Sequence, residues 1–248
     1  MENTMLKQKG LSQEGLKLIA CITMLIDHCD ATLLHSYIRV ASDSQMAVLM
    51  YNLLRIPGLI AFPIFSFLLV EGTHHTRNAK KYAARLAIAA ALSEIPFRLA
   101  FANVSFGSSN VMFTLLLGFL MIQSMGRVKS FWKVIVVIPF YLISDWIPMD
   151  HGGDGILLIA MLELTYGLKH EKLWRLAGFF FLFFDLSLWN IGYNIMFPLN
   201  QLPLLSIIPI FCYNGQKRTY SKNVQWAFYL FYPVHIFLLW LLKLVIFG

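Results

Sequence analysis

The sequence contains few charged residues. Asp, Glu, Lys and Arg make up 13% of its 248 residues, whereas hydrophobic residues make up 58%. Because soluble globular domains carry roughly a quarter charged residues, this composition excludes a surface that faces water over most of the chain. The mean hydropathy of +0.65 indicates a lipid-facing surface instead.

Two other features are scarce or missing. No stretch alternates apolar and polar residues with a period of two, which excludes a transmembrane β-barrel. Cysteine is rare: Cys21, Cys29 and Cys212 all lie in apolar runs, without the spacing of a disulfide framework or a metal cluster. We therefore interpret them as small packing residues and expect no bound metal.

Apolar runs of about 20 residues, the length that a helix needs to cross a bilayer, recur along the whole chain. The predicted spans are residues 14–34, 53–72, 79–101, 110–126, 131–148, 153–168, 172–189, 192–213 and 224–247, and the gap 35–52 has room for a short interfacial helix. We expect an all-α integral membrane protein, a single domain over residues 1–248 that forms one bundle of about nine transmembrane helices.

The positions of Lys and Arg predict the orientation of this bundle, since cytoplasmic loops are enriched in these residues. One side receives Lys7, Lys9, Arg77, Lys80, Lys81, Arg127, Lys129, Lys133, Lys169, Lys172, Arg175, Lys217, Arg218 and Lys222, and the other side Arg39 and Arg98. We therefore expect a cytoplasmic N-terminus and an extracytoplasmic C-terminus. The alternation also accounts for the net charge of +7, so we expect no nucleic-acid partner.

Charged side chains inside a spanning helix cost about 2.5–3.5 kcal/mol each on insertion scales, so they usually face a cavity or a partner. In this sequence they are Asp27, His28, Arg55, Glu94, Arg98 and His235. Asp27 and His28 point about 100° apart, so one can face a cavity while the other contacts a neighbouring helix. A histidine titrates near neutrality and suits proton transfer, although a structural contact between helices stays open.

The other polar positions have simpler interpretations. Glu94 and Arg98 are spaced i, i+4 and can neutralise each other. Arg55 at a helix start can extend its charge to the interface, and Asn110 is typical of packing between membrane helices. The Gly-rich loop 150–155 lacks the ligand spacing of a calcium site and is predicted to be a tight turn.

The densest cationic cluster consists of Arg77, Lys80, Lys81 and Arg85. A cytoplasmic loop of a membrane protein would carry such residues in any case. Arg and Lys at a helix start also bind phosphate through charge-assisted hydrogen bonds, so capture of a phosphorylated cytosolic cosubstrate is the alternative.

Several segments together resemble the TraX family of bacterial membrane proteins. In chain order they are LKLIACITMLIDH, RIPGLIAFPIFSFLLVEGTHHTRNAKKY, SEIPF, NVMFTLLLG, GILLI, YNGQKR and FYLFYPVH, between about residues 14 and 240. The resemblance implies a multi-pass acetyltransferase of the bacterial cytoplasmic membrane that uses acetyl-CoA. The family is named for a conjugative-plasmid protein that acetylates the N-terminus of pilin, but it also occurs outside conjugation systems.

The resemblance implies that His28 is the catalytic histidine. It also singles out Asp27, Arg55, Glu71, Arg77, Glu94 and His235. The first-helix histidine and the Y-P-x-H run are similar to features of membrane acyltransferases that modify glycans. Two places depart from the family pattern: Cys29 and Asp30 replace a frequent Gly, and Arg98 replaces a frequent Asp, which indicates a changed acceptor pocket.

The resulting hypothesis is a transfer of acetyl from acetyl-CoA to an amine or hydroxyl, on a peptide N-terminus or an envelope glycan. The phosphates would bind the cationic cluster, and His28 would be the general base, with Asp27 or Glu94 holding its imidazole. Arg55 and Asn110 are candidate donors to the oxyanion. Direct transfer and a two-step route through an acetylated His28 are both compatible with the sequence.

Two functions of other classes stay open. A proton-coupled transporter would use Asp27, His28 and Glu94 as a proton relay. A noncatalytic membrane protein of pilus or envelope assembly would need none of them.

Overall fold

The structure is a computed structural model of the whole chain, and it describes residues 10–40, 45–101, 108–183, 198–216 and 222–247. Every regular element in these ranges is a helix, and the β-type pairing is limited there to isolated bridges that join Leu11 to Tyr213 and Ser109 to Met149. The expected all-α architecture is confirmed.

The first helix begins at a capping serine. Helix α1 (Gln13–Cys29) starts after Ser12, whose side chain accepts a hydrogen bond of 3.2 Å from the N–H of Gly15. A π-helical segment, η1 (Asp30–Leu34), continues it into α2 (His35–Val40). Such segments inside α-helices are frequent at functional sites, and this one follows His28 closely.

The second predicted span is interrupted. The predicted span 53–72 lies within Leu49–His74, a helical segment that is long and apolar enough to cross a membrane. A short turn separates this segment into helix α3 (Gln45–Gly58) and helix α4 (Ala61–His74), which the sequence did not predict. Pro57 and Pro63 lack the N–H groups that would continue the helical hydrogen bonds through this region. The gap 35–52, where the sequence left room for a short helix, is helical in its described residues, which belong to α2 and the start of α3.

The central helices follow the predicted spans closely. They are α5 (Ala79–Phe101), α6 (Val111–Met125), the 3-10 turn η2 (Ser130–Trp132) with α7 (Lys133–Trp146), and α8 (Gly152–Thr165). The loop expected at 150–155 is shorter than predicted. His151 adopts a left-handed conformation with φ of 61°, and α8 already begins at the next residue.

The last part of the chain departs from a simple series of spans. Helix α9 (Glu171–Phe183) covers the described part of the span predicted at 172–189. The described part of 192–213 is a 3-10 segment, η4 (Pro198–Ser206), followed by the short helix α11 (Ile207–Phe211), so a continuous helix there is wrong. Prolines at 198, 203 and 209 interrupt regular α-helical bonding. Helix α12 (Lys222–Phe247) matches the predicted last span.

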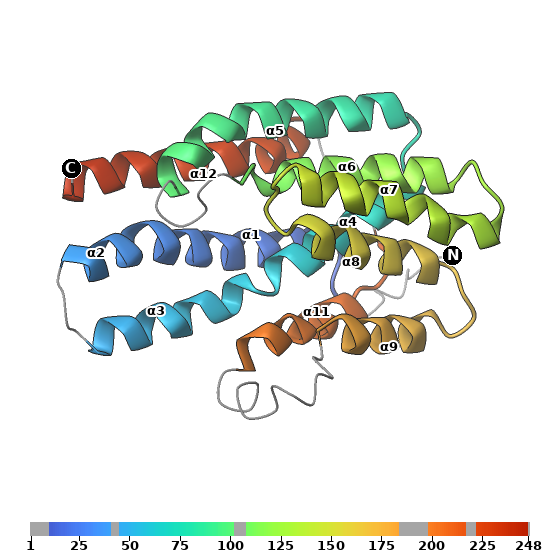
Figure 1. Cartoon of the computed structure of the whole chain (residues 1–248), viewed down its shortest axis with the longest axis horizontal. Coiled ribbons are helices and arrows are strands. Elements are labelled where there is room, and N and C mark those ends of the chain that lie inside the picture. Colours follow the sequence, from blue (N-terminus) through green and yellow to red (C-terminus); the bar gives the residue numbers. More distant parts are fainter. Residues whose placement is uncertain (1–9, 41–44, 102–107, 184–197, 217–221, 248) are drawn as a thin grey trace, which may run out of the picture.

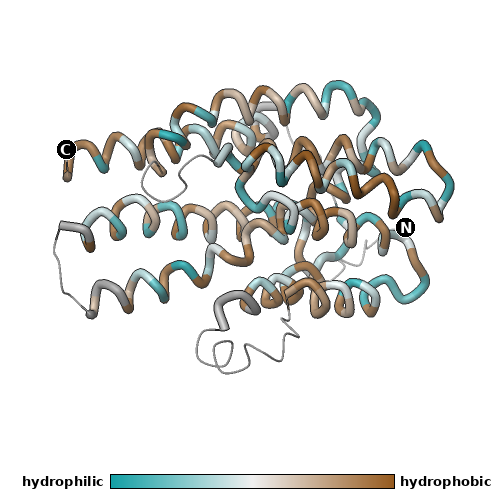
Figure 2. Tube along the Cα trace, in the orientation of Figure 1, coloured by the Kyte–Doolittle hydropathy of each residue, from teal (hydrophilic) through white to brown (hydrophobic). Residues whose placement is uncertain are grey.

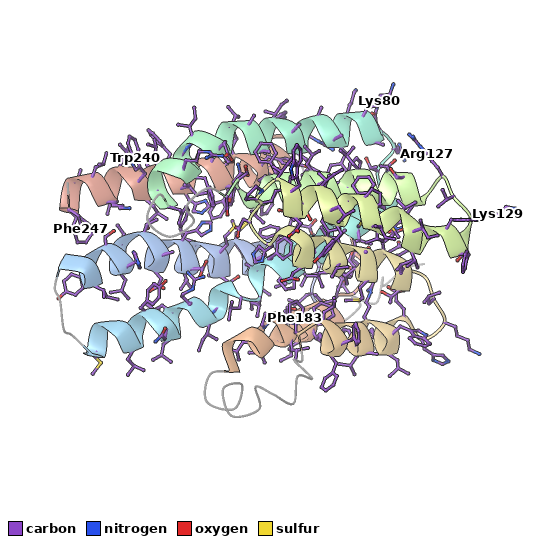
Figure 3. The ribbon with its side chains drawn as sticks, in the orientation of Figure 1. Lys80, Arg127, Lys129, Phe183, Trp240 and Phe247 are labelled. Atoms are coloured by element: carbon purple, nitrogen blue, oxygen red, sulfur yellow. The ribbon has the colours of Figure 1, made fainter. Side chains whose placement is uncertain are left out.

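The helices run roughly along the long axis of the molecule (Figure 1). α2, the start of α3 and the end of α12 lie at one end, with the C-terminus. The turns between α6 and α7 and between α8 and α9 lie at the opposite end. This second end carries Lys80, Arg127 and Lys129, whereas Phe247 lies at the first end (Figure 3), and we call it the basic end.

Apolar residues fill the interior and also cover much of the outside. Phe67, Phe119 and Phe179 are fully buried in one continuous core, whereas Val245 and Trp146 are 87% and 83% exposed. Hydrophobic residues extend along the outer helices in Figure 2. By length and composition, three helical segments of the described chain suffice to cross a membrane: Gln13–Ile38, Leu49–His74 and Trp226–Phe247.

Candidate active site

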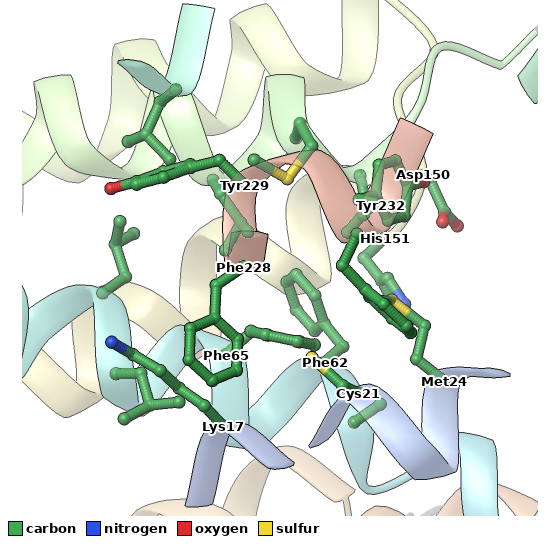
Figure 4. A pocket seen from close by; sticks show the side chains of 18 of the residues that line it. Lys17, Cys21, Met24, Phe62, Phe65, Asp150, His151, Phe228, Tyr229 and Tyr232 are labelled. Atoms are coloured by element: carbon green, nitrogen blue, oxygen red, sulfur yellow. The ribbon is translucent and has the colours of Figure 1, made fainter. Parts of the chain in front are cut away.

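A cavity of about 350 Å³ lies between the helices. Its walls come from α1, α4, α5, α6, α12, the end of α3 and the turn before α8. Lys17 and the hydroxyl of Tyr229 lie toward one side of this cavity in Figure 4, and Asp150 and His151 lie toward the other. Aromatic side chains such as Phe62 lie between the two sides.

One face of α1 forms a wall of the cavity. Lys17, Cys21, Met24 and His28 all line it, and their spacing of i, i+4, i+7 and i+11 keeps them on one helix face; Ala31 of η1 also lines the cavity. At a rise of 1.5 Å per residue, the backbone positions of Lys17 and His28 are roughly 16 Å apart along the helix. The cavity therefore connects a basic side chain to the histidine.

The imidazole of His28 contacts a second histidine. Its Nδ1 lies 2.7 Å from Nε2 of His235 on α12, and both residues are buried, at 9% and 6% exposure. The two rings are nearly parallel, with an interplanar angle of 8° and centroids 5.0 Å apart. On the far side, Nδ1 of His235 lies 2.7 Å from the carbonyl oxygen of Phe231, one turn earlier in α12.

These contacts determine the tautomers of the neutral pair. The carbonyl of Phe231 can only accept, so Nδ1 of His235 carries the hydrogen and its Nε2 is an acceptor. Nδ1 of His28 must then donate to that Nε2. The hydrogen of His28 is thus on Nδ1, which leaves Nε2 as an unprotonated base. This Nε2 has no hydrogen-bond partner within the described residues.

The surroundings hold the His28 ring and the helix that bears it. Phe101 and Tyr232 meet the ring edge-on, with centroids 5.0 and 5.9 Å away. Thr32 donates a hydrogen bond of 2.6 Å to the carbonyl of His28, which satisfies that oxygen where the π-helical segment departs from regular α-helical bonding. The ring is fixed on three sides by side chains.

Asp27 does not hold the imidazole of His28. It faces the break between α3 and α4, where its Oδ1 lies 3.7 Å from Nη1 of Arg55. Gly58 permits this approach, because a Cβ added there would lie 2.3 Å from the Cβ of Asp27. Asp27 and Arg55 both line the cavity, near Asp150.

The other end of the cavity carries two basic side chains among aromatic rings. The guanidinium of Arg85 lies 5.7 Å from the ring centroid of Tyr82 and 5.5 Å from that of Tyr229. Across the cavity, Nζ of Lys17 lies 5.2 Å from the ring centroid of Phe228. Nε of Arg85 is buried and has no hydrogen-bond partner within the described residues. Such an arrangement suits an anionic group.

The buried base His28 lines the same cavity as Lys17 and Arg85, the two basic side chains that we call the cationic mouth. A family model described as "TraX protein" matches residues 12–243. The chain belongs to the TraX family. A relative described as "Probable fimbrial assembly protein FimC, serogroup H1", from Dichelobacter nodosus, is 29% identical over 239 residues, covering 90% of this chain and 92% of that protein. No solved structure matches the chain.

In this TraX-family chain, Glu94 and Asn110 organise a helix start and do not line the cavity. Oε1 of Glu94 accepts a hydrogen bond of 2.6 Å from Nε of Arg98, as their spacing predicts. Its Oε2 accepts bonds of 2.7 and 3.1 Å from the side chain and the N–H of Asn110, which caps α6. Neither Glu94 nor Asn110 is a lining residue, which separates both from the expected roles beside His28.

The expected phosphate site is only partly inside the cavity of this TraX-family chain. Arg85 lines the cavity, but Arg77, Lys80 and Lys81 are exposed on the surface and do not. Position 85 lies further along α5 than the other three, so its side chain reaches the interior. The sequence interpretation did not name Lys17 as a site residue, although its spacing from His28 on one face of α1 is a signal for it.

Glu71 belongs to a separate polar cluster near the end of α4. Its backbone carbonyl accepts a hydrogen bond of 2.7 Å from Nδ1 of His75. Beside it, Nε2 of His74 lies 2.7 Å from Oε2 of Glu163, and the ring of His74 stacks on Tyr166 at 3.8 Å. The described side chains contain no group of three that could hold a metal ion. These residues connect α4 to α8.

Proposed function

We propose that this TraX-family protein is a membrane acetyltransferase that transfers acetyl from acetyl-CoA to an amine or hydroxyl acceptor. The observation that carries the proposal is one cavity that His28 and the basic side chains of Lys17 and Arg85 line together. An acyl-CoA has the matching chemistry, since its anionic phosphates and its thioester are joined by a long flexible arm.

The cationic mouth supports binding of the nucleotide part. Arg85 and Lys17 offer charge-assisted hydrogen bonds to phosphate, and Tyr82 and Tyr229 offer aromatic faces for a base. The exposed Arg77, Lys80 and Lys81 add positive charge just outside. The pantetheine arm then follows the face of α1 past Cys21 toward His28.

His28 acts as the general base in this proposal. Its Nε2 removes the proton of the acceptor while the acceptor attacks the thioester carbon, and it returns that proton to the sulfur when the carbon–sulfur bond breaks. His235 takes the place expected for a carboxylate: it orients the imidazole and accepts the Nδ1 hydrogen as positive charge develops. We favour direct transfer, because a general base accounts for the tautomer without a covalent intermediate.

The acceptor enters from the side of Asp27, Arg55 and Asp150, away from the basic mouth. The relative from Dichelobacter nodosus has a name that refers to fimbrial assembly. We therefore propose that a subunit of a surface fibre, modified at an amine, is the first acceptor class to test, with envelope glycans second.

The proposed setting is the bacterial cytoplasmic membrane. The basic end, with Lys80, Arg127 and Lys129, faces the cytoplasm and brings the cavity mouth within reach of cytosolic acetyl-CoA (Figure 3). The C-terminus then lies on the outer side. We keep about nine membrane crossings as part of the proposal. Three helical segments are long and apolar enough to cross a membrane, and the shorter or interrupted helices provide the other crossings in this proposal.

The test compares four proteins in lipid nanodiscs: the wild type, His28→Ala, a Lys17→Ala/Arg85→Ala variant and an Arg127→Ala/Lys129→Ala variant. Binding of acetyl-CoA and its slow hydrolysis are measured for each. Because a charge-assisted hydrogen bond contributes about 1.5–3 kcal/mol, removal of Lys17 and Arg85 should weaken binding at least about tenfold. His28→Ala should bind normally and lose turnover.

The Arg127→Ala/Lys129→Ala variant is the matched control, because it removes two positive charges from the same end at exposed positions outside the cavity. Its binding and turnover should equal those of the wild type. If the wild type binds no acyl-CoA, the acetyltransferase proposal is wrong, and proton flux in liposomes becomes the next measurement.

A further inference from the structure

A tyrosine whose ring packs against His28 has a buried hydroxyl that donates no hydrogen bond within the described residues. Tyr232 on α12 is 4% exposed and lines the cavity. The backbone N–H of Val111, which lies near this hydroxyl, is itself a donor and can bond only to the phenolic oxygen. The phenolic hydrogen is therefore available for an acceptor that enters the cavity.

The position of Tyr232 relates it to the two histidines. Its ring centroid lies 5.9 Å from that of His28 and 5.7 Å from that of His235, edge-on in both cases. Tyr232 and His235 are three residues apart on α12 and thus lie on one helix face. In Figure 4 the side chain of Tyr232 lies on the Asp150 side of the cavity, where the proposed acceptor enters.

A structural role does not explain this hydroxyl. A buried polar group without a partner destabilises the folded state, and a phenylalanine would fill the same space without that cost. Some buried hydroxyls do have partners: Thr114 donates to the carbonyl of Asp150, and Ser93 to that of Ala89. The hydroxyls of Ser66 and Ser206 also make no hydrogen bond within the described residues, but neither residue lines the cavity. A donor that is kept unpaired next to a base is an arrangement typical of a catalytic site.

We propose that Tyr232 is a further catalytic residue, whose hydroxyl donates a hydrogen bond to the carbonyl oxygen of the bound thioester. This inference rests on the proposed acetyltransferase function. As the acceptor attacks the thioester carbon, the carbon–oxygen double bond becomes a single bond to a negatively charged oxygen, and Tyr232 stabilises that charge. When the carbon–sulfur bond breaks, the double bond reforms, His28 gives its proton to the sulfur, and Tyr232 keeps its own.

The experiment substitutes Tyr232→Phe and uses acetyl-CoA with water as the acceptor, in nanodiscs. The change removes one oxygen atom and preserves the ring that packs against His28. We expect kcat to fall by about 10²–10³-fold, as for loss of one oxyanion donor, with KM for acetyl-CoA unchanged. Thermal unfolding should be unchanged or shifted upward, because the unpaired hydroxyl is gone.

A spectroscopic measurement reports the hydrogen bond directly. The carbonyl stretch of acetyl-CoA labelled with carbon-13 at the thioester shifts to lower frequency when the oxygen accepts a hydrogen bond. We expect that shift on the wild type and its loss on Tyr232→Phe. Tyr141→Phe is the matched control, because Tyr141 on α7 lies outside the cavity, and it should behave as the wild type.

The outcomes separate this inference from the proposed function. If the wild type neither binds nor hydrolyses acetyl-CoA, the function itself fails. If the wild type is active and Tyr232→Phe keeps kcat within threefold, or retains the shifted carbonyl stretch, the role of Tyr232 is refuted and the enzyme proposal stands.

Discussion

Replacing His235 tests the two-histidine arrangement most directly. In His235→Ala, the Nδ1 hydrogen of His28 loses its acceptor at 2.7 Å in a site where His28 is 9% exposed. Leaving a buried donor unpaired costs about 1–3 kcal/mol. The imidazole regains that free energy by rotating or by moving its hydrogen to Nε2, and either change removes the base from the cavity.

The expected loss of turnover follows from that cost. If the active orientation of His28 becomes less favourable by about 1–3 kcal/mol, the rate falls roughly 5- to 150-fold, since about 1.4 kcal/mol corresponds to a factor of ten. Binding of acetyl-CoA should change little, because Lys17, and Tyr229 against which Arg85 packs, lie on the other side of the cavity from Asp150. The assay is acetyl-CoA hydrolysis in nanodiscs, with affinity measured separately.

A second substitution distinguishes orientation from proton sharing. Glutamine at position 235 offers an amide oxygen close to the place of Nε2, so His235→Gln can still accept the Nδ1 hydrogen of His28, but it cannot take up a proton. Turnover close to that of the wild type would assign His235 to orientation alone, whereas turnover as low as that of His235→Ala would assign it to sharing the positive charge. Wild-type turnover in both variants would refute the reasoning, because the pair would then be irrelevant to the chemistry.

Three further changes have expected outcomes. Gly58→Ala places a Cβ 2.3 Å from that of Asp27 and should lower the free energy of unfolding by about 1–3 kcal/mol. Gly126→Ala is its control, because the added Cβ meets nothing closer than 3.6 Å; thermal unfolding of this variant should stay close to that of the wild type. Glu163→Gln weakens the 2.7 Å contact with His74 and should cost about 1–3 kcal/mol in denaturant unfolding while acetyl-CoA affinity stays constant. Asp27→Asn should change stability by less than about 1 kcal/mol, because the 3.7 Å pair with Arg55 is partly exposed; a larger thermal shift would contradict that estimate.

Long helices with clear apolar patterns were predictable from the sequence. The last helix, 224–247, and the span 79–101 agree with α12 and α5, because length and composition alone define such segments. The break between α3 and α4 was not predicted, since membrane helices often tolerate single prolines. The close approach of α1 to Gly58 in this region joins residues far apart in sequence, which no local pattern shows.

The sequence named both histidines of the pair but did not predict their contact. His28 and His235 were both candidates, but they are 207 residues apart in sequence, and no local pattern indicates that they meet. A carboxylate was the expected partner because acid–histidine pairs are common and Asp27 is adjacent. Adjacent helical residues, however, point to different faces, and that rule already separates Asp27 from the environment of His28.

The pairing of polar groups across the molecule argues that the cavity is the functional centre. Away from it, the buried Glu163 pairs with His74 and the buried Arg175 with Glu171, although the carboxylate of Asp30 makes no hydrogen bond within the described residues. Inside it, the hydroxyl of Tyr232 donates no hydrogen bond within the described residues, and its ring packs against that of His28. Since an unpaired buried polar group lowers stability, we interpret this hydroxyl as one whose hydrogen bond a substrate completes. The same reasoning predicts that the site becomes more stable, and not merely occupied, when acetyl-CoA binds, which a rise in unfolding temperature with ligand concentration would measure.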